Sequence, residues 1–574
     1  MKMKRFWVVA VAVFNLCLTT FISSLSAEEI EGTLDVLMAT KIENGGECGP
    51  VYFIKSKEKR TQFSPPADAP SLTPGQKIKI SGQWEWDADG KKNFRCGKIE
   101  LSAPPATPTK KNKKKRRSTA DISIYLPERA PVLGPQITLP VLVSFPDHSL
   151  PGWGKVEMDN KVFSNKHSDN FFWGECSWER MWLTGECLNG WKNMLKPSSE
   201  YGYGTDEEIN RISALMDDAI SMLDQYVDFR EWEGGRIIFM RTGKGWRYAF
   251  GTLGQWSFST NEGQINLALT VVSEICLPLE TLYISHELGH GLGLLHADSR
   301  RVSTGEFIGY GDDHSTMGRR FAQIDSLAKY RLGWLDTSQI KLISDDGEYQ
   351  LDQRELISAG IKLLIIFLGY DKDKSPILYF LEYFRELGEF DSKVFSSFEI
   401  EGKRKVVLLR KHERDLSKFS DSLTYLDNDD IPVLGLMQEY CDSEYNICFK
   451  ALEKTGEEAD SQAKVGIRFT KIIGEVSEIR LTSANIKRGK LFLLKGETTT
   501  VTAKVLDGEG LPVPSITIGT KSFNKKVSIS PLSALSDEEG SAEFTVTANS
   551  TKKGILKIFF TAQKVKKILR VKIK

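Results

Sequence analysis

One short segment carries most of the recognisable chemistry in this sequence. Residues 286–296 read HELGHGLGLLH, which has the form H-E-x-x-H-x-x-G-x-x-H. The chain has 7 histidines among 574 residues, and its own His, acid and Gly frequencies give about 10⁻⁵ chance matches to this form. Random occurrence is therefore a poor explanation, and the spacing predicts three imidazoles that share one metal ion.

Helix geometry explains the spacing. His286 and His290 are just over one turn apart, so both project from one face and can reach one Zn²⁺. A continuing helix would carry His296 away, and Gly293 is expected to leave the helix with positive φ and return it to the metal. Three ligands leave a position for water, whose pKa zinc lowers to about 7. Glu287 is turned aside from the ligands and is expected to act as general base.

Two other interpretations of this segment stay open. Leu282, Leu288, Leu292 and Leu295 show that the helix also packs, so it could be a histidine-rich core helix. Packing does not account for three spaced histidines plus an acid. The second alternative is a zinc site that binds metal without turnover.

The segment downstream adds a resemblance to a known family. Tyr310-Gly311-Asp312 leads to Ser315-Thr316-Met317-Gly318, and Leu332-Gly333-Trp334 closes the segment. With the histidine pattern, these residues resemble the gametolysin/autolysin-like metzincin proteases over roughly residues 138–340. The resemblance implies a zinc endopeptidase with a mixed sheet, an active-site helix and Met317 as the floor of the site. It assigns His286, His290 and His296 as metal ligands, Glu287 as the catalytic base, and extracellular proteins or glycoproteins as substrates.

His314 and the cysteines allow competing interpretations. A fourth protein ligand would displace the water, so His314 is expected to be an exposed or supporting residue. Cys96 either pairs with Cys48 or caps the zinc as a thiolate, as in some metzincin propeptides. The cap would make residues 28–104 an inhibitory prodomain. Further disulfides are expected for Cys176/Cys187 and Cys441/Cys448, with Cys276 as a buried thiol.

The N-terminus predicts export. Lys2, Lys4 and Arg5 precede an apolar run over residues 6–22, and small residues lead to Ala27. This order is typical of a cleaved signal peptide, with an uncleaved membrane anchor as the alternative. We therefore expect a secreted or extracellular protein, with periplasm or cell surface also possible.

Composition shifts divide the rest of the chain. We expect a multidomain α+β protein in which all-β domains flank the zinc domain. The predicted parts are a signal peptide (1–27), a small OB-like β domain (28–104), a Pro/Lys/Arg-rich linker (105–120), a metzincin-type domain (121–340), a β-rich accessory domain (341–474) and an Ig-like sandwich (475–574). The last part resembles bacterial invasin-type Ig-like domains.

Charge is unevenly distributed, although the formal net charge is only +1. Residues 478–574 carry 18 Lys+Arg against 8 Asp+Glu, and residues 110–117 carry seven cations. The second stretch is interpreted as an extended linker, a processing site or a docking site for a polyanion. The basic C-terminal part suggests contact with an anionic cell surface or matrix, and nothing indicates binding to nucleic acid.

Together these patterns predict an exported zinc endopeptidase. The alternative is a surface adhesin or binding protein whose zinc site is structural or vestigial.

Overall fold

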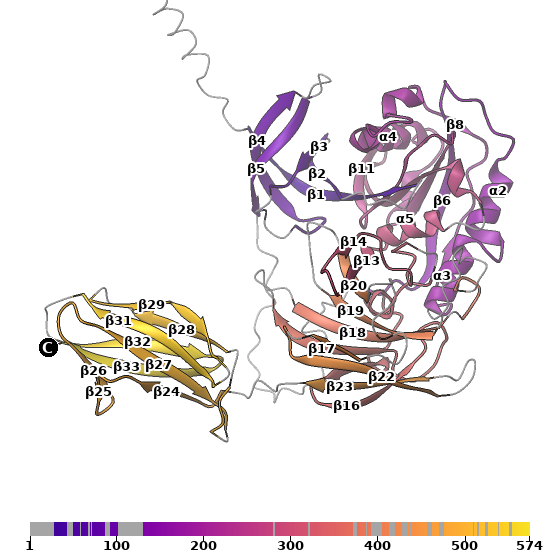
Figure 1. Ribbon diagram of the computed structural model, residues 1–574. Coiled ribbons are helices and arrows are strands. Elements are labelled where there is room, and N and C mark those ends of the chain that lie inside the picture. The colour runs from indigo at the N-terminus through magenta and orange to yellow at the C-terminus, as the bar shows by residue number, and fades with distance from the viewer. Residues whose placement is uncertain are drawn as a thin grey trace, which may run out of the picture. The chain divides into compact units, whose positions relative to one another are not determined.

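Figure 1 shows the computed structural model of the chain. With short gaps inside several ranges, it describes residues 28–42, 50–101, 130–278, 282–319, 322–370, 376–391, 405–412, 420–426, 434, 439–469 and 476–573. The predicted signal peptide and the linker at 105–120 lie outside the described residues. The chain divides into two compact units, residues 1–440 with 449–467 and residues 441–448 with 468–574. Within the described part, no helix is both long and apolar enough to cross a membrane.

The first strands of unit one close on themselves. Their order is β2-β3-β5-β4-β1, and an additional β1–β2 pairing joins the two ends. Leu34, Val36 and Met38 alternate toward the barrel interior, where they pack with Ile54 and Ile80. The strands are β1 (Glu28–Lys41), β2 (Val51–Ser56), β3 (Lys59–Ser64), β4 (Lys77–Trp86) and β5 (Lys92–Leu101).

The long strand β1 runs out of this barrel into a second sheet. Its residues Leu37–Lys41 pair antiparallel with β10, and the order continues β10-β12-β9-β6-β7. Strands β12, β9, β6 and β7 are parallel to one another, while β11 pairs with β12 and β8 with β6. Their bounds are β6 (Gly134–Ser144), β7 (Met181–Thr184), β8 (Lys192–Asn193), β9 (Arg236–Arg241), β10 (Tyr248–Thr252), β11 (Trp256–Thr260) and β12 (Gly263–Ser273).

Helices cover both faces of this sheet. The three- and four-residue apolar spacing expected over 205–227 forms α4 (Glu208–Leu223), whose buried side packs with alternate residues of the strands. Helix α5 (Tyr283–Gly291) packs with the opposite set of strand residues, against β10 and β12. The remaining helices are α2 (Lys155–Asp159), η2 (Asn160–Ser164), α3 (Asp169–Ser177), η3 (Ser198–Tyr201), η4 (Phe229–Trp232), η5 (Glu274–Cys276), α6 (Ser326–Arg331) and η6 (Thr337–Gln339).

Two further sheets follow. One has the order β14-β13-β20-β19-β18-β17-β15, and the other β16-β23-β22-β21. The bounds are β13 (His296–Arg301), β14 (Phe307–Ile308), β15 (Ile340–Ile343), β16 (Gly347–Asp352), β17 (Leu363–Tyr370), β18 (Pro376–Arg385), β19 (Lys405–His412), β20 (Ser420–Leu426), β21 (Glu439–Asp442), β22 (Ile447–Thr455) and β23 (Gln462–Phe469).

Unit two contains a β-sandwich. Sheets of order β24-β27-β31-β29 and β25-β26-β33-β32-β28-β30 share one apolar core that includes Phe544 and Phe560. The two-sheet sandwich expected in the C-terminal segment is present. Its strands are β24 (Glu478–Thr482), β25 (Ile486–Lys487), β26 (Lys490–Leu493), β27 (Thr498–Leu506), β28 (Thr517–Ser522), β29 (Val527–Ser530), β30 (Ser533–Leu535), β31 (Ser541–Ala548), β32 (Gly554–Ala562) and β33 (Val565–Ile573).

The predicted α+β fold class is corrected by this architecture. Strands form 49% of the described residues and helices 15%, so the chain is mostly β. The prediction gave too much weight to a few strongly periodic helices, because short strands that pair over long sequence distances leave a weaker local signal.

The cysteines differ in part from expectation. Cys441 and Cys448 form a disulfide, while Cys176 and Cys187 are separate buried thiols, so that predicted pair is wrong. Cys176 lies at the end of α3 and Cys187 follows β7, and closeness in sequence does not bring their sulfurs together. Cys276 is a buried thiol, as predicted, and Cys48 lies outside the described residues.

Candidate metal centre

Helix α5 positions the first two histidines. Every residue from Ile284 to His290 is buried, because the short helix lies between the central sheet and the residues around Met317. Two glycines make this close packing possible. A Cβ at Gly251 on β10 would lie 2.5 Å from the Glu287 carbonyl oxygen, and a Cβ at Gly289 would lie 2.6 Å from the Met317 sulfur. Side chains at either position would push the helix away from its neighbours.

The chain leaves α5 through a glycine turn. Gly293 has φ +85°, and the N–H groups of Gly293 and Leu294 donate to the carbonyls of His290 and Gly289 at 2.8 and 3.0 Å. This left-handed ending satisfies the last helical carbonyls and reverses the chain. His296 follows three residues later as the first residue of β13. The turn thereby returns the third histidine to the helix, as its glycine predicted.

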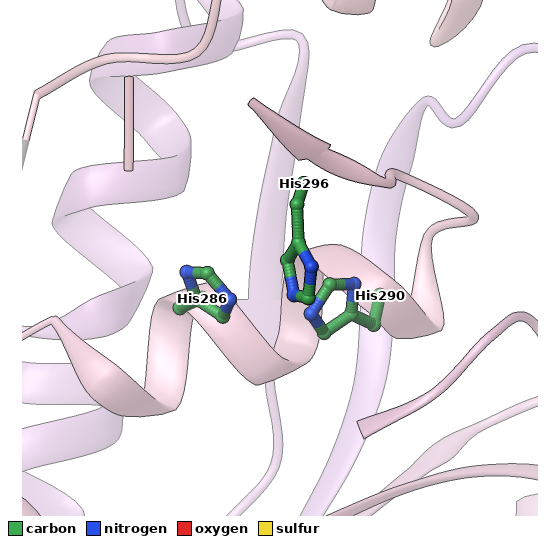
Figure 2. Close-up of side chains that lie close together, drawn as sticks. All are labelled: His286, His290 and His296. Atoms are coloured by element: carbon green, nitrogen blue, oxygen red, sulfur yellow. The ribbon is translucent and has the colours of Figure 1, made fainter. Parts of the chain in front are cut away.

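The three imidazoles converge. One nitrogen from each of His286, His290 and His296 lies within 4.8 Å of the other two. Figure 2 shows His286 and His290 on the helix and His296 pointing toward them from the strand above. Ring centroids are 4.9 Å apart for His286–His290, 4.8 Å for His290–His296 and 5.5 Å for His286–His296. These separations allow three nitrogens to share one small ion.

Backbone carbonyls orient two of the rings. His286 Nδ1 lies 2.6 Å from the Thr316 oxygen, and His290 Nδ1 lies 2.8 Å from the Leu294 oxygen. An N–H donated from Nδ1 leaves Nε2 as the lone-pair nitrogen. The Nε2 atoms of all three histidines are buried without a hydrogen-bond partner. A buried acceptor without a partner is costly, and a metal ion is the partner that this donor set fits.

Burial also keeps the rings neutral. It lowers the pKa of His286 to about 4, although the Thr316 carbonyl opposes the shift. Burial and the neighbouring imidazoles lower the pKa of His290 and His296 well below the usual range. Neutral imidazole is the form that binds metals.

Glu287 lies on the same helix but is not part of the convergent set. Its side chain is fully buried, and this burial raises its pKa to about 8, against a smaller opposing effect of the Thr40 hydroxyl. Thr40 belongs to β1, at the position paired with Ala249 of β10. The Glu287 carboxyl group therefore lies beside the three histidines and is enclosed by β1, the strand that extends from the barrel.

Sequence reasoning missed Tyr310 as a site residue. Its ring lies 4.0 Å from His296 and 5.8 Å from His286, measured between centroids, and its hydroxyl donates to the Ala39 carbonyl on β1 at 3.0 Å. The Asp298 carboxylate accepts the Tyr310 N–H at 2.7 Å. Tyr310 is the first residue of the Tyr310-Gly311-Asp312 motif. Its contact with β1 could not be inferred from the sequence, because that contact depends on the pairing of β1 with β10. Tyr310 and β1 together close this side of the cluster.

The other predicted site residues are placed as follows. Met317 is buried beneath α5 against Gly289. His314 is also buried, and its Nδ1 lies 3.5 Å from an Asp312 oxygen, outside the three-histidine group. Cys96 lies in the barrel core and its thiol donates to the Lys98 carbonyl, so it does not cap the histidines.

Comparisons with known proteins give a different picture from the motif. No family model matches the sequence, and no curated protein matches it. Among solved structures, an intimin fragment in complex with the intimin-binding domain of the translocated intimin receptor is 18% identical, with a TM-score of 0.13. That match covers 17% of this chain and 33% of the fragment.

Two other adhesins are similar at the same level. The adhesin InvE of Yersinia pseudotuberculosis is 9% identical with a TM-score of 0.19, over 30% of this chain and 55% of that one. The Escherichia coli adhesin FdeC is 14% identical with a TM-score of 0.17, over 29% and 58%. The chain thus spans about a third to somewhat over half of these proteins. At such scores the likeness assigns no partner or activity to this chain.

These comparisons correct the family and activity predicted from the motif. The structures found include adhesins, a fimbrial chaperone and S-layer proteins, and the assignment to gametolysin/autolysin-like metzincins is not supported. The same holds for the predicted metalloendopeptidase activity with Glu287 as its base. Eleven residues specify the local geometry of an ion site, and neither the fold of a 574-residue chain nor turnover follows from them.

Proposed function

We propose that this protein is an exported cell-surface binding protein with a zinc centre on His286, His290 and His296. The observation that carries the zinc centre is the convergence of three buried Nε2 atoms without hydrogen-bond partners. Nitrogen ligands at this spacing suit Zn²⁺ better than Ca²⁺ or Mg²⁺, which prefer oxygen. When bound, zinc supplies a compact double positive charge and a Lewis acid.

The residues around the cluster support a strongly held ion. The carbonyls of Thr316 and Leu294 fix two rings through Nδ1, which removes most of the freedom that metal binding would otherwise have to restrict. All three histidines are at least 96% buried, so bound metal would exchange slowly with solvent.

Surface attachment is the second part of the proposal. The signal-peptide-like N-terminus supports export, and the C-terminal Ig-like sandwich is a fold that many cell-surface domains use. Protein partners, and anionic surface or matrix polymers, are the ligands that we propose for it. The excess of lysine and arginine over residues 478–574 favours the anionic polymers.

The metal content of the secreted protein tests the zinc centre. We expect about one zinc per chain by elemental analysis after gel filtration, and loss of that zinc in His286→Ala/His290→Ala. His167→Ala is the matched control, because His167 pairs with Glu389 and lies outside the cluster. A wild-type protein that is folded but takes up no zinc from a buffered excess would refute the proposal.

A further inference from the structure

The six-stranded sheet of the sandwich has an unusual charge distribution. Its described strands contain no aspartate or glutamate, whereas they contain eight lysines and arginines. The opposite sheet carries both signs, for example Glu478 and Arg480 on β24 and Glu543 on β31. Among the described strands of the sandwich, the positive charge therefore gathers on one of the two sheets.

The pairing registers place four of these cations in a row. Lys487 on β25 pairs with Lys490 on β26, Lys490 pairs with Arg570 on β33, and Arg570 pairs with Lys557 on β32. Directly paired residues share a face of the sheet. The alternate positions on these strands, including Leu491, Leu569 and Ile558, form the core. The row of Lys487, Lys490, Arg570 and Lys557, here called the basic row, thus lies on the outer face.

Like charges directly opposite each other on neighbouring strands destabilise a sheet. The basic row makes three such pairings in succession, and no carboxylate in the described strands of this sheet offsets them. Lys566 and Lys572 extend the same face, two or four residues along β33 from Arg570. A surface that concentrates repulsive charge is suited to an anionic partner.

The shape of the row indicates the form of that partner. Neighbouring strands lie about 4.8 Å apart, so the four cations span about 14 Å in a line across the strands. Lys487, Arg570 and Lys557 are exposed and Lys490 is half-buried, which leaves the line open to a long chain. Evenly spaced cations across one face of a sheet suit a linear polymer with regularly spaced negative groups.

We infer that the basic row is a binding surface for an acidic polysaccharide that bears sulfate or carboxylate groups. The inference rests on the surface attachment proposed above and is independent of the zinc centre. Single-stranded nucleic acid is disfavoured because its binding uses exposed aromatic rings for stacking. On this face the Phe492 and Phe559 rings are only half-exposed, and Lys566 lies 4.4 Å from the Phe559 centroid.

Charge reversal within the row provides the test. In Lys490→Glu/Lys557→Glu, carboxylates alternate with the remaining cations Lys487 and Arg570, so every cross-strand pairing in the row becomes attractive and folding should not suffer. The matched control is Lys495→Glu/Lys504→Glu, which makes the same change in net charge in the turn before β27 and on the opposite sheet. Full-length protein is used throughout, and thermal melting verifies each variant.

Heparin, a sulfated polysaccharide, is the probe. We expect wild type to bind it with an affinity that falls steeply with salt. The row variant should lose affinity by about 30-fold or more, while the control should change by less than about fivefold.

Equal losses of heparin affinity in both variants, or no heparin binding by wild type, would overturn the inference. Binding of duplex DNA or of anionic lipid vesicles that is as tight as heparin binding would overturn the choice of polysaccharide. His290→Ala should bind heparin like wild type, which separates failure of this inference from failure of the zinc centre.

Discussion

Two buried polar regions of unit one behave in opposite ways. In the histidine cluster, three Nε2 atoms point toward one another without hydrogen-bond partners. In a nearby cluster of Asp312, Arg354, Glu382 and Arg410, here called the ionic cluster, each charge meets an opposite charge. Glu382 accepts from Arg354 at 2.8 Å and from Arg410 at 2.9 Å, and Arg410 also pairs with Asp312.

This difference distinguishes a cluster that stabilises the fold from a cluster that is suited to bind a ligand. The ionic cluster joins β18, β19 and the segment before Met317, and its charges compensate one another within the chain. The histidine cluster is equally buried but is compensated only when something from outside supplies positive charge. Burial alone therefore does not identify a site. The convergence of three unpartnered nitrogens on one point does.

The largest expected effect is in the ionic cluster. Glu382→Ala leaves two buried guanidinium groups without their shared carboxylate, and we expect a loss of about 3–5 kcal/mol in the free energy of unfolding, measured by urea titration. Glu348→Ala, which breaks an exposed pair with Lys464, should change stability by less than about 0.5 kcal/mol. Zinc per folded chain should stay at the wild-type value, and a Glu382 variant that lost its zinc would show that the two clusters are not separate.

The next effect concerns the histidine cluster. Without metal, His290→Ala should cost only the lost packing and the hydrogen bond from Nδ1 to the Leu294 carbonyl, since its Nε2 makes no hydrogen bond. With free zinc at about a hundred times its dissociation constant, wild type should gain about 3 kcal/mol and the variant nothing. Melting curves with and without zinc measure this difference. A zinc-dependent gain that survives in His290→Ala would place the metal elsewhere.

Features of the site that depend on nearby residues can be predicted from the sequence, whereas features that depend on distant residues cannot. The shared face of His286 and His290 and the positive φ of Gly293 follow from helix geometry within eight residues, and they were predicted. The closure of the site was not. Ala39 and Thr40 reach it from about 250 residues away through the pairing of β1 with β10, which leaves no local signal.

Other features that the sequence did not reveal have the same origin. Residues 28–104 are predicted as a small β domain, and no local pattern indicates that Leu37 and Ala39 of β1 also pack in the core of the central sheet. Arg410 and Asp312 are 98 residues apart, and no spacing rule joins them. The family assignment extended a well-specified local site to a domain of roughly residues 138–340 and to an activity, which is where it failed.

A third prediction concerns pH and the edge of the ionic cluster. Glu355 is fully buried beside Arg354, and burial raises its pKa from 4.5 to about 8 despite that arginine. The unfolded chain releases this proton near pH 4.5 and the folded chain only near pH 8, so wild-type stability should fall as the pH rises between these values. Glu355→Gln should remove that fall, as measured by urea titrations at about pH 5 and pH 8.5. Glu348→Gln is the exposed control. Parallel pH profiles for wild type and Glu355→Gln would mean that Arg354 keeps Glu355 ionised.

The smallest effect tests the boundary between barrel and histidine cluster. Tyr310→Phe keeps the ring against His296 but removes the hydroxyl that donates to the Ala39 carbonyl at 3.0 Å. We expect a loss of about 1 kcal/mol with unchanged zinc content, measured by melting and elemental analysis.

Tyr349→Phe is the control. It removes the same kind of bond, from hydroxyl to the Asp345 carbonyl at 2.8 Å, but at the surface. Water can replace that bond, so its loss should cost less than about 0.5 kcal/mol. If the two variants lost equal stability, the contact of β1 with the histidine cluster would be no stronger than a surface bond. The site would then be closed by packing of the strand alone.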